Sequence, residues 1–397
     1  MRAARLAVVA AAAAVLLAAG ALPAAATDCA TLPTPIYVAG STAAKPFLAE
    51  IGKFMAGQTP PVTIVYSGQG SCTGVEAILS GTTVTGTGTG APRYWDATGL
   101  EVSCDIVGAA PLAHIGISDV FPQTCFPLPG GLPTSVADYL GPVQAMTFVA
   151  HRSSTEKTIS GEAAYNVFGF GASSGVAPWT DDTLIIRRDS LSGTQRMVAT
   201  AIGVPAEKWK GIQSTSSGDL LARLGAAAIP DRSIGILSAD VAQDNLATVK
   251  ILAYQHFGQS CALFPDSREN SNDKANVRSG QYPIWGPLHS LIRLNGSGYP
   301  ANTRAGEIAG YLAGTRPTPA GLDLINVSAQ RHVVPQCAMR VKRTQEAGAP
   351  APFAPAGACG CYYELIATGG TTCKPCGTSA ECPKATPVCS YGYCEPQ

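Results

Sequence analysis

The chain has 397 residues, and its 27 lysines and arginines balance 27 aspartates and glutamates. It therefore lacks the basic excess that is typical of nucleic-acid-binding proteins. Hydrophobic residues make up 46% of the sequence, which is enough for a packed core, and the length suggests two domains.

The first 26 residues have the pattern of a secretory signal peptide. Arg2 and Arg5 precede an apolar run over 6–22, and alanines at 24–26 provide a small-residue cleavage site. Their removal would leave a net charge of 25 − 27 = −2. No later apolar run approaches the roughly 20 residues that span a bilayer. We predict an exported protein, periplasmic or at the cell surface, with no transmembrane segment in the mature chain.

The body alternates strand-like and helix-like segments. Runs of β-branched and apolar residues predict strands at 36–38, 62–66, 114–117, 147–149, 184–186, 233–237 and 249–252. Apolar residues at helical spacing predict a helix over 46–55, and a second helix is expected from Gly193 to Gly203. Strands interleaved with helices predict an α/β fold with largely parallel sheets.

Three of the predicted strands end in a turn of glycine and hydroxyl residues, at 39–42, 67–74 and 188–194. Small residues let backbone N–H groups approach a ligand, and the helix start that follows attracts anions. Arg188 adds a guanidinium that can bind two oxygens of a tetrahedral oxyanion. A single turn of this kind is most often only a turn, and hydroxyl residues before helices are also ordinary N-caps. The three in succession predict an anion site at the carboxyl ends of the strands.

In this order the motifs resemble those of the periplasmic phosphate-binding proteins of ABC phosphate transporters, a group of type 2 periplasmic binding proteins. The resemblance covers roughly residues 35–315 and rests on the segments 39–46, 66–75, 115–119, 188–194, 233–237 and 281–285. It implies two α/β lobes with a hinge that close on inorganic phosphate, with no enzymatic step, cofactor or metal. It also implies an ABC-transporter membrane component as a partner. The phosphate-binding residues that it implies are Thr42, Ser71, Asp119, Arg188, Ser192, Gly193 and Thr194.

Asp119 would select the anion. A carboxylate inside an anion site is costly unless it accepts a proton from the ligand, and monohydrogen phosphate has that proton whereas sulfate does not. Two other readings stay open at this point. Asp119 could only cap a turn, and Arg188 could form a surface ion pair of small value.

The chain departs from the resemblance in several places. Ala43 stands where the family has an aromatic residue, and Cys72 and Thr73 replace Ser-Gly in the second loop. Between Ser71 and Asp119 lie 47 residues (72–118), which include an inserted Thr/Gly-rich segment. The insertion could widen the cleft or have no role in ligand binding. The alternative function is therefore a cell-surface recognition or adhesion protein with a larger or phosphorylated ligand. An enzyme such as an exported phosphatase is less favoured still. The segment 171–175 fits the serine-hydrolase elbow, but no helix start follows it, so Ser173 is not expected to be a nucleophile.

The thirteen cysteines are unevenly spread, with six before residue 340 and seven in the last 39 residues. In an exported chain they predict disulfides, and the odd total leaves one cysteine over. A zinc site at Cys373 and Cys376 is disfavoured because no histidine follows.

These patterns predict five segments. They are a signal peptide (1–26), lobe I (29–142 and 285–345), lobe II (143–284), a Pro/Ala-rich linker (346–358) and a disulfide-rich C-terminal module (359–397). We expect the linker to insulate the module from the lobes, unless Cys337 bridges to Cys359 or Cys361.

Overall fold

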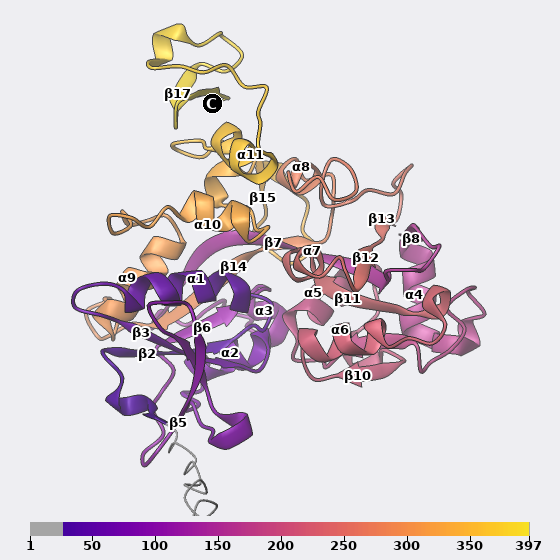
Figure 1. Cartoon of the computed structure of the whole chain (residues 1–397), viewed down its shortest axis with the longest axis horizontal. Coiled ribbons are helices and arrows are strands. Elements are labelled where there is room, and N and C mark those ends of the chain that lie inside the picture. Colours follow the sequence, from indigo (N-terminus) through magenta and orange to yellow (C-terminus); the bar gives the residue numbers. More distant parts are fainter. Residues whose placement is uncertain (1–26, 397) are drawn as a thin grey trace, which may run out of the picture.

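The computed structural model describes residues 27–396, so the predicted signal peptide lies outside the described residues. The fold is mixed α/β and has two lobes (Figure 1). Its main sheet has 12 strands in the order β1-β5-β4-β3-β2-β6-β14-β7-β11-β9-β10, with β12 paired to β7. None of the helices in residues 27–396 is both long and apolar enough to cross a membrane.

Lobe I contains the N-terminal half of this sheet. Its strands are β1 (Thr27–Asp28), β2 (Pro35–Gly40), β3 (Thr63–Gly68), β4 (Arg93–Trp95), β5 (Glu101–Asp105) and β6 (Ile115–Ser118). Its helices are α1 (Lys45–Ala56), α2 (Ser71–Leu79), α3 (Pro122–Cys125), α9 (Thr303–Leu312) and α10 (Leu324–Gln330). Phe47 and Ile51 of α1 pack with Ile308 of α9 and Ile64 of β3 in a buried core.

Lobe II contains the other half. Its strands are β9 (Ile185–Arg188), β10 (Ile212–Ser214), β11 (Ile234–Ser238) and β12 (Val249–Ile251), beside a small sheet of β8 (Thr158–Ser160) and β13 (Ala253–Gln255). Its helices are α4 (Gly161–Phe170), α5 (Gly193–Ile202), α6 (Ser217–Gly225), α7 (Ala239–Asp244) and α8 (Ala275–Arg278). The predicted second helix is thus α5, which ends where Gly203 takes a φ of 73°.

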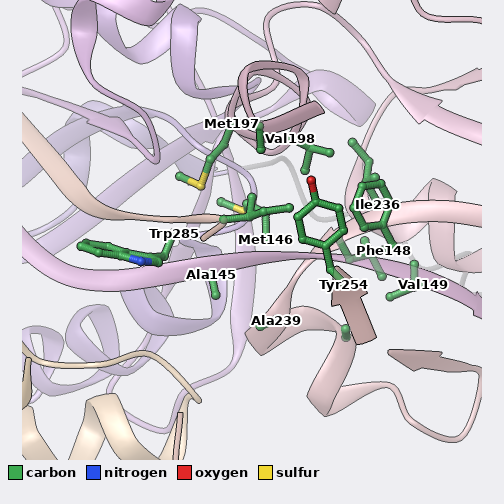
Figure 2. Close-up of a cluster of buried hydrophobic side chains, with 14 of the residues drawn as sticks. Ala145, Met146, Phe148, Val149, Met197, Val198, Ile236, Ala239, Tyr254 and Trp285 are labelled. Atoms are coloured by element: carbon green, nitrogen blue, oxygen red, sulfur yellow. The ribbon is translucent and has the colours of Figure 1, made fainter. Parts of the chain in front are cut away.

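Two long strands, β7 (Val136–His151) and β14 (Trp285–Arg293), carry the chain from one lobe to the other and back. Residues 141–150 of β7 are all buried, because packed elements cover both faces of the strand. Figure 2 shows Met146 and Phe148 of β7 packed with Met197 of α5 and with Tyr254. Each of the seven predicted strands overlaps an observed strand, and β7 extends far beyond its predicted part.

The expectation of largely parallel sheets is correct for the central strands of each lobe. It is wrong for β4, which is antiparallel to β3 and β5, and for the strands that pair with the crossing strands. β2 is parallel to β3 and β6, and β9 is parallel to β10 and β11. However, β14 is antiparallel to β6 and β7, and β11 is antiparallel to β7. β7 and β14 run in opposite directions because the chain leaves lobe I through β7 and returns through β14.

The described cysteines form six disulfides, which confirms the disulfide-rich C-terminal end. The pairs are Cys29–Cys104, Cys72–Cys125, Cys337–Cys359, Cys361–Cys373, Cys376–Cys389 and Cys382–Cys394. Cys261 is the free cysteine, and it is exposed. The sulfur atoms of Cys376, Cys382 and Cys394 lie within 4.8 Å of one another, but all three are in disulfides and are thereby unsuited to bind a metal.

The tail contains the hairpins β15 (Val341–Lys342)–β16 (Ala351–Pro352) and β17 (Val388–Ser390)–β18 (Tyr393–Glu395), and the helix α11 (Gly360–Thr368). Tyr363 of α11 is fully buried in the same core as β7, and Cys337 is bonded to Cys359. The apolar residues of α11 therefore find burial against the body, against the expectation that 346–358 insulate the tail. The domain boundaries themselves stay a prediction.

Candidate anion-binding site

Four helices begin near one another where the lobes meet, as the contacts of Arg188 and Gly193 with residues at these helix starts show. They are α1 and α2 of lobe I and α5 and α6 of lobe II. The Cys72 N–H donates to the Leu191 carbonyl at 3.1 Å across the interface, so the lobes are closed on each other. A helix start presents unpaired N–H groups and the positive end of the helix dipole. Four such starts from two lobes make a region that favours negative charge.

Glycines make this close approach possible. Gly40 ends β2 with a φ of 136°, and a Cβ there would lie 2.0 Å from the Ile117 carbonyl oxygen. Gly193 has the same role at the lobe interface, since its Cβ would lie 2.1 Å from Ser71 Oγ and 2.9 Å from Asp119 Oδ2. A larger residue at either position would push apart the turns that form the site.

Arg188, at the end of β9, is the central cation of the site. Its side chain is 1% exposed; Nη1 donates to Ser217 Oγ at 3.1 Å, and Nη2 to Thr42 Oγ1 at 3.4 Å. Its Nε is buried with no hydrogen-bond partner. No ion pair within 4.0 Å joins Arg188 to a carboxylate of residues 27–396. Burial lowers the pKa of Arg188, although Asp189 and Asp119 favour its charged form.

A buried guanidinium without a carboxylate partner is costly, because its loss of hydration is not compensated. The buried guanidinium of Arg188 is therefore suited to bind an external anion. This placement also excludes the alternative of a surface ion pair.

Asp119 follows β6 and faces Arg188 across the site. It is 2% exposed; its Oδ1 accepts from Ser41 Oγ at 2.5 Å and its Oδ2 from Ser71 Oγ at 2.9 Å. Burial raises the pKa of Asp119, in opposition to these hydrogen bonds and to the charge of Arg188. A carboxylate whose charged form is penalised in this way is suited to share a proton with a ligand.

The structure brings most of the predicted residues into direct contact. Thr42 meets Arg188, Ser71 meets Asp119, and Gly193 packs against both Ser71 and Asp119. Ser192 and Thr194 are each 2% exposed and flank Gly193, and Ser192 Oγ caps α5 by accepting from Gln195 N–H. Their role toward a ligand stays a prediction.

Arg187 precedes Arg188 on β9 and takes a different direction. Its Nη1 donates to Gln213 Oε1 at 3.0 Å. It lines a depression of about 460 Å³ between the lobes, together with Gln69 and Thr73. As expected for neighbours on a strand, the two arginines do not share a partner side chain.

Sequence reasoning missed Ser41 and Ser217. Ser41 Oγ holds Asp119 and accepts from the N–H groups of Ala43 and Ala44, while Ser217 positions Arg188. The signal for Ser217 was present, because 214–218 is a fourth hydroxyl-rich turn between a strand and a helix.

A second buried carboxylate, on Asp240 of α7, was also missed. Gln144 of β7 donates through Nε2 to the Ala43 carbonyl at 3.3 Å and to Asp240 Oδ2 at 3.4 Å. Burial raises the pKa of Asp240 to about 7, and the charge of Asp119 adds to the shift. Asp240 Oδ1 and Gln144 Oε1 are buried without a hydrogen-bond partner. No local motif marks these residues, since only the packing of α7 against β7 brings them together.

The departures in the second loop have structural explanations. Cys72, the second residue of α2, is bonded to Cys125 of α3, so a disulfide joins the elements on both sides of Asp119. The inserted segment forms β4 and β5, which extend the sheet beyond β3. Glu101 of β5 pairs with Lys45, the first residue of α1, at 2.8 Å. The insertion therefore borders the lobe I side of the site.

Neither protein-family models nor curated proteins match the sequence. The fold, however, matches solved structures. A proposed phosphate ABC transporter substrate-binding protein from Clostridium perfringens, solved with bound phosphate, has a TM-score of 0.51 at 13% identity, over 76% of this chain and 99% of that one. An ABC-type phosphate transport receptor from Vibrio cholerae has a TM-score of 0.47 at 12% identity, over 75% and 99% of the two chains. The match to the Clostridium protein shows that this chain has the fold of that substrate-binding protein.

Proposed function

We propose that the protein binds inorganic phosphate in the cleft between its lobes. The observation that carries this proposal is Arg188, a buried guanidinium without a carboxylate partner, surrounded by four helix starts and opposite a buried carboxylate. Its fork supplies two donors to an oxyanion, and the turns of Thr42, Ser71 and 192–194 supply hydroxyl and backbone donors. Closure of the lobes brings both sets onto a single anion.

Asp119 makes monohydrogen phosphate the preferred anion. The ligand's hydroxyl donates its proton to a carboxylate oxygen, so that one proton is shared between two groups that would otherwise repel each other. Sulfate at neutral pH has no proton to donate, and it would place two negative groups in contact in a buried site. The site therefore distinguishes two tetrahedral dianions of similar size by their protonation.

The protein acts by binding and not by catalysis. Ser173, in the elbow-like segment, lies in a short 3-10 turn (Gly171–Ser174) and donates to the Phe170 carbonyl at 2.6 Å. It lacks the strand before it and the helix after it that a nucleophile elbow requires.

We further propose an exported protein that delivers phosphate to the membrane component of an ABC transporter. Six disulfides support an oxidising compartment outside the cytoplasm. The equal numbers of basic and acidic residues argue against a nucleic acid as partner, because nucleic-acid-binding proteins usually carry an excess of basic residues.

Titration calorimetry of the purified protein with phosphate, sulfate and a sugar phosphate tests the proposal. We expect one phosphate per chain and no measurable heat with sulfate at pH 7.5. Binding of the sugar phosphate alone would contradict the proposal and favour a recognition protein with a larger ligand.

A further inference from the structure

Residues 336–369, which we call the C-terminal strap, contact both lobes and a crossing strand. The strap includes β15, β16 and α11. Figure 1 shows α11 between α10 of lobe I and α8 of lobe II, whereas α2, α3 and α5 lie on the other side of β7. The helix α11 of the strap therefore lies behind the crossing strands, away from the loops that meet the anion.

Arg278 of α8 joins the strap to lobe II. Its side chain is 5% exposed, and it donates from Nε to the Ala338 carbonyl at 3.1 Å and from Nη2 to the Gly360 carbonyl at 3.0 Å. The guanidinium also lies 5.3 Å from the ring centroid of Tyr363. Backbone pairing adds a bond from the Arg340 N–H to the Arg278 carbonyl at 2.9 Å. A single buried side chain of lobe II thus binds the strap near its start and at the first residue of α11.

Asp323, the N-cap of α10, joins the strap to lobe I. Tyr362 of α11 donates to its Oδ2 at 2.9 Å, and the Cys337–Cys359 disulfide closes the strap just beyond α10. Leu324 of α10 packs against the core of lobe I. Because α11 is bonded to α8 on one side and to α10 on the other, relative motion of the lobes must break one set of contacts.

The same segment reaches the hinge and the anion site. Arg343 stacks 3.8 Å from the ring centroid of Trp285, where the chain enters β14, and its Nη1 donates to the Trp285 carbonyl at 3.1 Å. Glu346 Oε2 accepts from the Phe121 N–H at 3.3 Å, two residues after Asp119. The strap therefore holds a crossing strand and the turn that carries the site carboxylate.

We propose that the C-terminal strap holds the two lobes closed, so that a bound anion exchanges slowly. Opening a hinge on the cleft side displaces the elements behind the hinge relative to each other. Here the Arg278 and Tyr362 contacts resist that displacement. The ligand in this inference is the phosphate of the proposed function, whereas the restraint on the lobes is independent of it. The protein would accordingly retain phosphate instead of releasing it readily.

Lobe opening is measured by the distance between two spin labels in the full-length protein. One label is attached to the free, exposed Cys261 of lobe II and the other to Ser297→Cys in an exposed loop of lobe I. Without phosphate, we expect one narrow distance distribution in the parent chain. The double variant Arg278→Met, Tyr362→Phe should show a second population, and phosphate should restore the narrow one. The exposed Arg268→Met serves as the matched control.

Stopped-flow dissociation of phosphate is the second measurement, and we expect at least a tenfold faster rate in the double variant. If that variant does not fold, Tyr362→Phe with Cys337→Ser and Cys359→Ser replaces it. A narrow distribution without phosphate in a folded strap variant would overturn the inference. A parent chain that binds no phosphate would instead refute the proposed function, while the label distances would still test the strap.

Discussion

Thr42 and Arg188 lie in different lobes, and Oγ1 of Thr42 is 3.4 Å from Nη2 of Arg188. This distance is at the long end of the hydrogen-bond range, so the contact itself contributes little. An oxyanion between the two groups would accept a hydrogen bond from each, and the bond from the guanidinium would be charge-assisted. A bound anion would therefore stabilise the closed arrangement of the site more than the direct contact between Thr42 and Arg188 does.

Replacing Arg188 tests the central cation. Phosphate has few atoms, and at about 1.5 kcal/mol for each non-hydrogen atom its binding free energy is limited to roughly 7.5 kcal/mol. Micromolar binding needs about 8.2 kcal/mol. Binding of phosphate with that affinity would therefore require nearly every contact in the site. Loss of one partner of a buried charged pair costs about 2–5 kcal/mol, and Arg188→Ala should weaken phosphate binding by roughly 30-fold or more in calorimetry.

Two further variants sharpen this measurement. Arg188→Lys should recover only part of the affinity, because an ammonium does not present the two-pronged fork. Arg187→Ala is the control, since the Arg187 side chain binds Gln213 and contacts Arg188 only through its backbone carbonyl. Loss of binding in Arg187→Ala together with normal binding in Arg188→Ala would show that the wrong arginine has been assigned.

Asp119 predicts a pH-dependent choice between anions. Burial raises its pKa, so protonation of the carboxyl on acidification removes the charge that repels sulfate. Sulfate affinity should therefore rise as the pH falls from 8 to 5. The Asp119→Asn variant should bind sulfate with little pH dependence, and its affinities for sulfate and phosphate should differ less than those of the unmodified protein. Equal binding of phosphate and sulfate by the unmodified protein at pH 8 would refute the proton-sharing role.

Asp240 predicts that the ligand-free protein loses stability as the pH rises. Its pKa is about 7 in the folded protein, against about 3.9 in an unfolded chain. Between these values the folded state holds a proton that the unfolded state has released, so the free energy of unfolding falls by up to about 1.4 kcal/mol per pH unit. The loss ends above pH 7, where both states are ionised.

Urea unfolding at pH 5, 6, 7 and 8 without phosphate measures this effect. Asp240→Asn should show a smaller decrease than the unmodified protein, and its advantage should be largest at pH 8. Glu346, whose pKa burial raises to about 7, adds a decrease of the same sign to both proteins. Identical pH dependence in the two proteins would argue against a buried, proton-binding Asp240.

The Cys72–Cys125 disulfide should support both stability and binding. It closes a separation of 53 residues, for which the chain-entropy model gives about 4 kcal/mol. Cys72→Ser with Cys125→Ser should lower the free energy of unfolding by about 2–4 kcal/mol and weaken phosphate binding, because the bond joins α2 to α3 around Asp119. The control is Cys382→Ser with Cys394→Ser in the C-terminal end, which should leave phosphate affinity within twofold. Similar affinity losses in both variants would contradict a local role.

The sequence alone determined the α/β class, the strands and helices with strong periodicity, and the three turns around which the candidate site is built. The three turns that contain Thr42, Ser71 and Arg188 were predictable because the glycine and hydroxyl residues of each turn are consecutive in the chain, whereas the family resemblance singled out the individual residues. A short segment contains the whole signal, since a strand end, a tight turn and a helix start are local structures.

Tertiary structure alone decided what depends on distant segments. Gln144 reaches Asp240 across 96 residues, and the pairing of Cys72 with Cys125 depends on how α2 packs against α3. The same is true of the strap, in which Arg278 of lobe II binds carbonyls near residues 338 and 360. Such contacts form between residues whose spacing in the chain has no fixed period, so their side chains meet only when the core has placed both elements.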